Sequence, residues 1–184
     1  PMTVPLPAGY SVRPPTADDI PMMVELFTTS SLHDVGESQV TAEEIARQFS
    51  MPGINIHDIA WLVFNSDEQL IGMGLAASFP PFVQIYGLMT IHPDYREQHV
   101  VDYLTERILK QAETYVPNAP EDARVEIVAG VDGRNQWLQG VLRDLGFVKA
   151  RGFFEMKIDM DTQPPEAQFR DNLSLRPLEA ARGR

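Results

Sequence analysis

The sequence has 184 residues, 43% of them hydrophobic, with no cysteine and a formal net charge of −11 at pH 7. This length suits one well-buried core, and the missing cysteines exclude disulfides, thiolate nucleophiles and cysteine-based metal sites. The negative charge repels phosphate backbones and argues against a nucleic-acid partner. Since no stretch resembles a membrane span or an N-terminal secretory leader, we predict a cytoplasmic protein without a membrane partner.

The N-terminal part of the chain predicts one strand and two helices. Residues 10–13 alternate in polarity and stop at two prolines, which is typical of a short strand. A helix is expected to start at residues 16–19, followed by apolar residues at helical spacing. Thr41 and Glu44 fit a capping box, which predicts a second helix over residues 42–50. The polar residues 30–40 predict a loop between the two helices.

The rest of the chain alternates between strand and helix patterns. A hairpin, a third strand, a long helix, a strand buried on both faces, a second helix closed by Gly146 and two final strands are expected. The hairpin is expected over residues 60–65 and 70–79, the next strand over 83–91 and the long helix over 98–115. The buried strand is expected over 125–131, the helix before Gly146 over 135–145, and the two final strands over 147–150 and 153–160. The order β-α-α-β-β-β-α-β-α-β-β predicts an α/β fold with a mixed central sheet flanked by helices.

We predict one domain over residues 1–161, followed by a polar linker and tail over residues 162–184. Within the tail, residues 173–177 (LSLRP) echo residues 10–14 (YSVRP). One interpretation is coincidence in a disordered tail. The other is that the tail starts a second repeat of the same fold.

The predicted junction between the strand that ends near Ile91 and the helix that follows is a candidate anion site. The strand pattern breaks at Pro93, and a helix pattern starts within a few residues. A helix start leaves backbone N–H groups without carbonyl partners, and these groups together with the helix dipole attract anions. We therefore predict a phosphate cradle over residues 91–101.

Two motifs together resemble the GCN5-related N-acetyltransferase (GNAT) superfamily over about residues 10–160. The first is the strand followed by His-Pro-Asp-Tyr-Arg, at residues 92–96, and a helix. The second is Asn135 at a helix start with Leu-Gly-Phe, residues 145–147, at its end. In this superfamily a loop of the form R/Q-x-x-G-x-G/A holds the acetyl-CoA diphosphate with backbone amides, and two splayed strands receive the pantetheine arm.

The resemblance implies acetyl-CoA as co-substrate and a small-molecule or peptide amine as acceptor. The residues it assigns to the cofactor are Thr90, Ile91, Arg96, Glu97, Gln98, His99, Val100, Val101 and Asn135. Arg96 is either a phosphate contact or a solvated surface arginine. Asn135 is either only a helix cap or a cap that also touches the cofactor arm. No metal site is expected, because the four histidines lack metal-binding spacing.

The chain departs from the superfamily pattern at several positions. Glu97, His99 and Val101 stand where the loop would carry glycines, and Glu97 brings negative charge toward a negative ligand. His99 either offsets part of that charge when protonated or is an exposed residue at the helix start. Leu142 occupies the position of the tyrosine that protonates the leaving thiolate. Ile85 occupies the position of the glutamate that some relatives carry.

The catalytic residues therefore stay unassigned. Glu126 and Tyr86 are candidate relay groups, but a buried carboxylate is more often an ion-paired structural residue and a tyrosine more often a packed aromatic. His33, Asp34 and Glu37 lie in the predicted loop that lines the acceptor pocket in this superfamily. Their acidity suits a cationic amine, although polar loop residues are usually only solvated.

Two functions follow from these observations. The first is an acetyl-CoA-dependent N-acyltransferase acting on a small-molecule or peptide amine. The alternative is a catalytically weak or silent GNAT-like domain that serves as the partner half of a tandem or dimeric protein. The lost glycines and the missing tyrosine motivate the alternative, and apolar strand ends at the sheet edges favour a homodimer without indicating the surface.

Overall fold

The computed structural model describes residues 4–38, 40–154, 156 and 158–166. The chain divides into two units, residues 1–148 and residues 149–184. All helices and strands found among the described residues lie in the first unit. Among the same residues, no helix is both long and apolar enough to cross a membrane.

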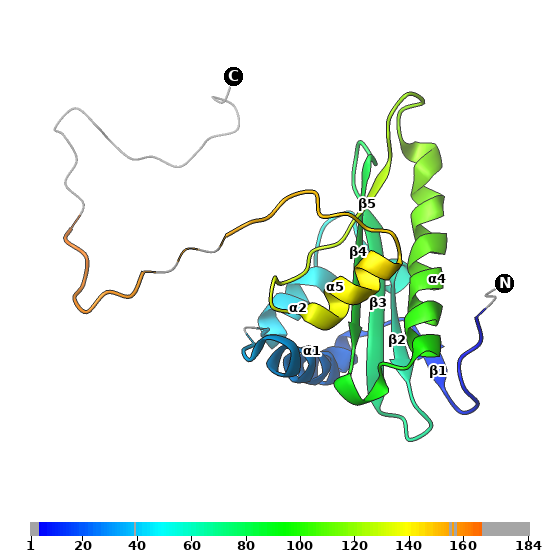
Figure 1. Cartoon of the computed structure of the whole chain (residues 1–184), viewed down its shortest axis with the longest axis horizontal. Helices are drawn as coiled ribbons and strands as arrows, with labels where there is room; N and C mark the ends of the chain where they lie inside the picture. Colours follow the sequence, from blue (N-terminus) through cyan, green and yellow to red (C-terminus); the bar gives the residue numbers. More distant parts are fainter. Residues whose placement is uncertain (1–3, 39, 155, 157, 167–184) are drawn as a thin grey trace. The chain divides into compact units, whose positions relative to one another are not determined.

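The first unit contains a five-stranded sheet with the strands in chain order across it (Figure 1). The strands are β1 (Ser11–Arg13), β2 (Ala60–Phe64), β3 (Leu70–Ser78), β4 (Gln84–Ile91) and β5 (Glu126–Val128). Neighbouring strands are antiparallel up to β4, whereas β4 and β5 run parallel. The predicted mixed sheet and the hairpin of β2 and β3 are confirmed.

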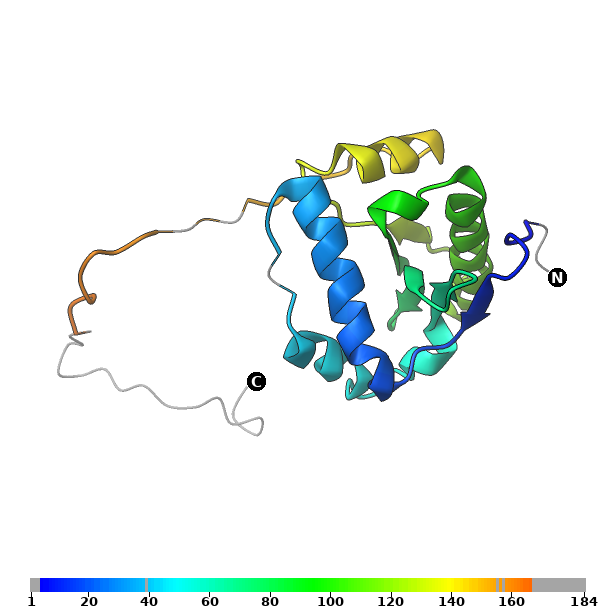
Figure 2. The ribbon, with the colours of Figure 1, turned by 90° about the horizontal axis from the view of Figure 1, so that it is seen from below.

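Helices cover both faces of this sheet (Figure 2). They are α1 (Ile20–Val35), α2 (Ala42–Phe49), the one-turn α3 (Ile56–Ile59), α4 (Gln98–Tyr115) and α5 (Gln136–Asp144). Met23, Leu26 and Ile45 of α1 and α2 pack in one core cluster with β2 and β3. On the opposite face, Val101 and Leu104 of α4 form a second cluster, against which α5 packs. The predicted α/β fold, with helices flanking a central sheet, is confirmed.

Local signals explain several element boundaries. The capping box of α2 is present, because the Thr41 N–H donates to Glu44 and the Glu44 N–H donates to the Thr41 hydroxyl. Gly146 follows α5 in the left-handed region (φ 85°), as its predicted C-terminal glycine. The helix predicted over residues 98–115 has the bounds of α4.

The predicted loop over residues 30–40 begins too early. Helix α1 continues to Val35 and ends at Gly36, whose φ is 81°. Ser30 is buried, and its hydroxyl donates to the Ile91 carbonyl at 2.8 Å. This tertiary contact outweighs the low helix propensity of the Thr-Thr-Ser-Ser segment.

The strand predicted over residues 125–131 is also shorter than expected. Only residues 126–128 pair with β4, and none of them is fully buried. The chain leaves the sheet after Val128, so the apolar residues that follow line a cavity instead of continuing a ladder. The prediction of a strand buried on both faces was therefore wrong.

The two final strands predicted over residues 147–150 and 153–160 are absent among the described residues 147–154, 156 and 158–160. Val148, Phe154 and Met156 are at least 86% exposed. Alternating polarity shows only that a segment could lie on a sheet, and a strand exists only where a neighbouring strand pairs with it. The echo motif at residues 173–177 lies outside the described residues.

An ion pair between the buried Asp19 and the half-exposed Arg13 lies at the start of α1 and gives a pH-dependent prediction. Asp19 is 3% exposed and accepts hydrogen bonds from Arg13 at 2.6 and 2.7 Å and from the Thr16 N–H. The hydrogen bonds from Arg13 lower the pKa of Asp19 to about 2, against the opposing effect of burial. Because this pKa is depressed, the stabilisation is present above about pH 4 and is lost as the pH falls toward 2.

We expect Asp19→Asn to lower the free energy of unfolding by about 2 kcal/mol at pH 7. The difference from the wild type should disappear between pH 4 and pH 2, measured by urea unfolding across that range. Asp18→Asn, at the exposed neighbouring residue, is the control and should change little. A constant difference down to pH 2 would contradict the ionic origin of the effect.

Candidate functional site

The candidate site is a gap between β4 and β5. The two strands pair only from Gln84 with Glu126 to Tyr86 with Val128. Beyond this point β4 continues to Ile91, whereas β5 has already ended. The two strands therefore separate beyond this pairing, toward the end of β4 that leads to α4, as the splayed strands of the resembling superfamily imply.

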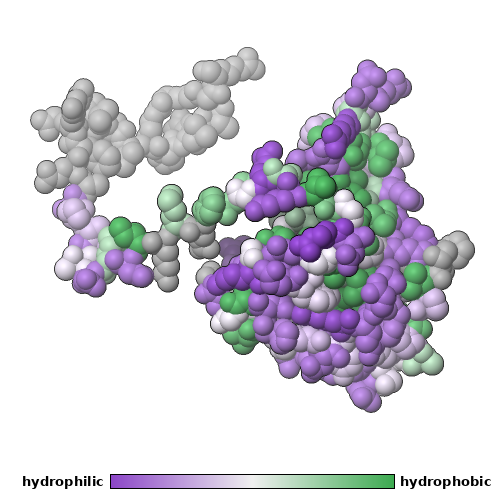
Figure 3. All heavy atoms as spheres, viewed as in Figure 1, coloured by the Kyte–Doolittle hydropathy of each residue, from purple (hydrophilic) through white to green (hydrophobic). Residues whose placement is uncertain are grey.

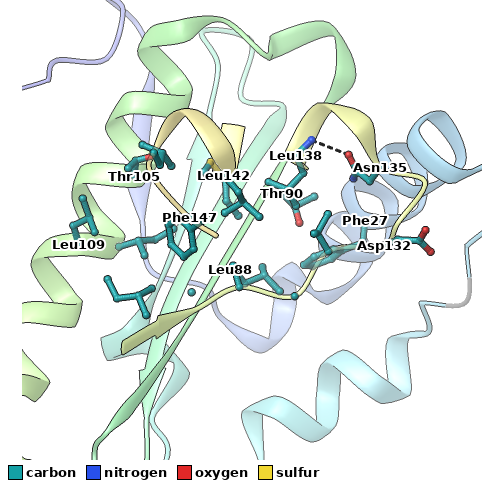
Figure 4. A pocket seen from close by; sticks show the side chains of 18 residues that line it. Phe27, Leu88, Thr90, Thr105, Leu109, Asp132, Asn135, Leu138, Leu142 and Phe147 are labelled. Atoms are coloured by element: carbon teal, nitrogen blue, oxygen red, sulfur yellow. Dashed lines mark hydrogen bonds between the residues drawn. The ribbon is translucent and has the colours of Figure 1, made fainter. Parts of the chain in front are cut away.

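A cavity of about 270 Å³ occupies this gap. Its walls come from β4, the segment after β5, α4 and α5, and its lining is predominantly apolar. Figure 4 shows Leu88 and Phe27 around the cavity, with Leu138 and Leu142 of α5 on the other side. Hydrophobic residues are also visible at the molecular surface around α5 (Figure 3). A slot of this kind fits an extended, largely apolar ligand arm.

A second cavity of about 220 Å³ adjoins the first and is more polar. The two share Phe27, Thr90 and Asn135 among their lining residues. The second cavity also contacts Asp34 of α1, so it lies on the face of the sheet that α1 covers. A ligand held between β4 and β5 would reach both faces of the sheet through this pair of cavities.

The residues predicted to bind the cofactor divide into two groups. Thr90, Ile91 and Asn135 line at least one cavity. The others, residues 96–101, line neither cavity. They form the end of the β4–α4 connection and the first turn of α4. The side chains of Val100 and Val101 are buried in the core, so only their backbone could face a ligand.

The N-terminus of α4 keeps donors for an anion. The N–H groups of Val100 and Val101 donate to the Glu97 carbonyl, whereas the preceding N–H groups, of Gln98 and His99, have no carbonyl ahead of them in a helix. Glu97 is the N-cap residue and its side chain does not cap the helix. These amides and the dipole of an 18-residue helix favour negative charge at this point.

Side chains around this helix start are charged. The Glu97 carboxylate lies 3.0 Å from Nε2 of His99, and the His99 ring contacts Tyr10 edge-on at 6.4 Å between centroids. Burial and, next, the charge of Glu97 raise the pKa of Tyr10. A carboxylate therefore lies at the start of α4, as the sequence indicated.

The structure gives Arg96 partners within the protein. Its guanidinium donates to both oxygens of Asp34 at 2.7 Å, and its Nε donates to the Ile91 carbonyl at 3.3 Å. The Trp137 ring covers the guanidinium at 3.9 Å. The side chains of Arg96 and Asp34 are only 10% and 7% exposed.

Asn135 belongs to the same cluster. Its side-chain oxygen accepts from the Leu138 N–H at 2.9 Å and caps α5, as predicted (Figure 4). Its Nδ2 donates to Asp34 at 3.0 Å. The sequence did not indicate Trp137, Ser30 or Asp34 as partners of Arg96, because the pairs are far apart in the chain.

The carboxylates predicted for the acceptor side are paired. Burial raises the pKa of Asp34, but hydrogen bonds from Arg96 and His33 outweigh it and hold this pKa below its usual value. Glu37 pairs with Arg134 at 2.7 Å, and hydrogen bonds from the same arginine lower the pKa of Asp132 to about 2. Each of these acids already faces a cation.

The two candidate relay groups lie outside both cavities. Glu126 is not buried as predicted: its side chain is 47% exposed and pairs with Arg124 at 3.1 Å. Glu126 lies at the start of β5, the edge strand of the described sheet. Tyr86 is also half-exposed, and its hydroxyl donates to Gln84. Neither residue lines a cavity.

Comparisons with known proteins add the fold relationship. Neither a protein-family model nor a curated protein matches the sequence. Solved structures do match, among them a GCN5-related N-acetyltransferase from Sphaerobacter thermophilus, with a TM-score of 0.69 at 20% identity over 77% of this chain and 44% of that one. The chain has the GNAT fold.

Two other solved structures are matched by this chain over most of their own length. A phosphinothricin acetyltransferase from Sinorhizobium meliloti, solved with acetyl-CoA, has a TM-score of 0.56 at 18% identity over 75% of this chain and 74% of that one. An aminoglycoside 6'-N-acetyltransferase from Acinetobacter baumannii has a TM-score of 0.55 at 14% identity over 83% and 99%. The chain spans less than half the length of the Sphaerobacter protein.

Proposed function

We propose that this chain binds acetyl-CoA between β4 and β5 and transfers the acetyl group to the amine of a small molecule or peptide. The observation that carries the proposal is the slot between the splayed strands, which leads to the start of α4. The pantetheine arm would lie in the apolar cavity beside Thr90 and Asn135. The diphosphate would meet the backbone N–H groups of Gln98 and His99 at the start of α4.

In this arrangement the chain contributes to catalysis chiefly by positioning the amine and the thioester. The amine would approach from the second cavity and attack the thioester carbon, and CoA would leave as the thiolate. The lining carboxylates Asp34 and Asp132 are both paired with arginines, so neither is a free base. Proton removal from the amine is therefore assigned to water in the second cavity.

The position of Leu142 favours a second candidate function. Its side chain lies in the cavity at the place where the resemblance implies a tyrosine (Figure 4). A leucine cannot protonate a leaving thiolate, and such proton transfer contributes typically about 10²- to 10⁴-fold in rate. A domain that binds acetyl-CoA with little turnover, as a partner half of a larger protein, would keep the slot and lose this group.

Isothermal titration with acetyl-CoA, followed by an acetyl-transfer assay on a panel of amines, tests the proposal. The assay can follow released CoA with a thiol reagent, because the chain contains no cysteine and adds no background. Binding with turnover supports the transferase, and binding without turnover supports the second candidate. No heat of binding and no thermal stabilisation at millimolar acetyl-CoA would refute both.

Glu97 offers a test of the diphosphate position. Its carboxylate, about half exposed, lies at the start of α4, and at about 6 Å from a phosphate it would cost roughly 0.7 to 3 kcal/mol, with the lower end favoured by solvent. We expect Glu97→Gln to raise the affinity for acetyl-CoA about 3- to 10-fold by titration. The same change should slightly lower stability, since a negative residue favours a helix start.

The matched control for this prediction is Glu113→Gln, which removes the same charge from the exposed far part of α4. It should leave the affinity unchanged at the ionic strength used. An unchanged or weaker affinity in Glu97→Gln would place the diphosphate away from the start of α4.

A further inference from the structure

The cluster around Arg96 joins three elements that surround the proposed site. Arg96 lies in the turn between β4 and α4, Asp34 lies on α1, and Trp137 lies in the first turn of α5. The chain distances between these residues are long, since Arg96 and Asp34 are 62 positions apart. The cluster therefore ties the turn to one helix on each face of the sheet.

The donors of the Arg96 guanidinium point at acceptors of the protein. Nη1 and Nη2 bind the two Asp34 oxygens, Nη2 also lies 3.5 Å from the Ser30 hydroxyl, and Nε faces the Ile91 carbonyl. Such a two-pronged arginine–carboxylate pair has fixed geometry as well as charge. Each of the three nitrogens thus has an acceptor within the protein, Trp137 covers one face, and the side chain is only 10% exposed.

We infer that Arg96 is a positioning residue, which holds α1, the end of β4 and α5 around the cavity, and not a phosphate ligand. The inference rests on the proposed function and refines its cofactor site. On this view the backbone N–H groups at the start of α4, and not the Arg96 side chain, bind the diphosphate. The Asp34 carboxylate completes the tie, because it receives Arg96 and Asn135 together, and Asn135 caps α5. Loss of either charge releases the wall of the cavity that α5 provides.

The two roles predict opposite behaviour when Asp34 is changed. Asp34→Asn keeps the Arg96 side chain but breaks its ion pair with residue 34. Arg96→Ala also breaks this ion pair, and Arg96→Lys weakens it, because lysine lacks the planar guanidinium fork. When fewer molecules hold the competent arrangement, the apparent Kd of every ligand in the slot rises by the same factor. If Arg96 instead bound phosphate, Asp34→Asn would free its guanidinium for the diphosphate, and the affinity for acetyl-CoA would stay the same or increase.

The experiment titrates the wild type, Asp34→Asn, Arg96→Ala and Arg96→Lys with acetyl-CoA and with acetyl-pantetheine, which has no diphosphate. We expect Asp34→Asn and Arg96→Ala to weaken both ligands by one common factor of about tenfold, with Arg96→Lys between them and the wild type. Weakening of acetyl-CoA alone in Arg96→Ala, with full affinity in Asp34→Asn, would overturn the inference. Full recovery by Arg96→Lys would also overturn it.

A second measurement is independent of any ligand. The chain has two tryptophans, Trp61 and Trp137, so a Trp61→Phe background leaves Trp137 as the reporter. We expect Asp34→Asn and Arg96→Ala to shift its emission to the red and to lower the midpoint of thermal unfolding together. Arg143→Ala, at an exposed arginine of α5, is the control and should change neither.

The two measurements separate the two proposals. If the wild type binds neither ligand, the proposed function fails, and the emission of Trp137 still decides the role of Arg96. Unchanged emission in Asp34→Asn and Arg96→Ala would show that the cluster does not hold α5, and would overturn the inference even if acetyl-CoA binds.

Discussion

Replacing Leu142 with tryptophan is expected to reduce the affinity for acetyl-CoA by at least about 100-fold, which corresponds to about 2.8 kcal/mol. Leu142 lies on α5 and faces the cavity between β4 and β5 (Figure 4). An indole ring at this position would occupy part of the 270 Å³ cavity in which the proposed pantetheine arm would lie. Binding would then require α5 to move, at a cost typical of overpacked interiors.

The fold should tolerate this change. The cavity is open space in the free protein, and no residue of α5 is fully buried. We therefore expect the midpoint of thermal unfolding to stay within a few degrees of the wild type. The measurement is a titration with acetyl-CoA, accompanied by thermal unfolding without ligand.

Arg143→Trp is the matched control, since it places the same side chain on the next residue of α5, at an exposed position outside the cavity. Its affinity should equal that of the wild type. If Leu142→Trp also binds acetyl-CoA with wild-type affinity, the cofactor does not use the slot between β4 and β5, and the proposed function loses the observation that carries it.

The sequence predicted the elements whose signals are local. Helix α4 has strong apolar periodicity, and Pro117 follows its last turn, so its bounds could be read directly. The capping box of α2 and the glycine after α5 are signals within a few residues of the element that they end. The central sheet followed from the alternation of these elements.

The sequence failed where long-range packing decides. Ser30 is a weak helix former, yet its bond to Ile91 and the pairing of Asp34 with Arg96 extend α1 by almost two turns beyond the predicted end. Glu126 looked buried because apolar residues surround it in the chain. Glu126 is exposed because it lies at the start of β5, the edge strand of the described sheet, and no local pattern reveals an edge position.

The candidate site was only partly predictable for the same reason. The resemblance placed the slot beside β4 and the anion site at the start of α4, because both depend on motifs within one short segment. The partners of Arg96 come from α1 and α5, up to 66 positions away, and only a folded structure brings them together. A family motif identifies the position of an arginine but does not fix which group its side chain binds.

The site also depends on how closely α4 approaches the sheet, and Leu104 makes the contact between this helix and β3. The side chain is fully buried over Gly72 and Gly74 of β3. A Cβ added at Gly74 would lie 3.0 Å from Cδ2 of Leu104, and one added at Gly72 would lie 3.4 Å from Cδ1. The two glycines therefore leave the space that Leu104 fills, and this packing holds the helix against the sheet.

Leu104→Ala is expected to lower the free energy of unfolding by about 3 to 5 kcal/mol, because glycines below the leucine have no side chains to fill the resulting cavity. Urea unfolding monitored by circular dichroism measures this change. Leu109→Ala is the control on the same helix: Leu109 is 42% exposed, and its truncation should cost less than about 1 kcal/mol. A cost below about 1.5 kcal/mol for Leu104→Ala would mean that α4 packs less tightly on β3, and the start of α4 would then lack the fixed position that the proposed diphosphate site needs.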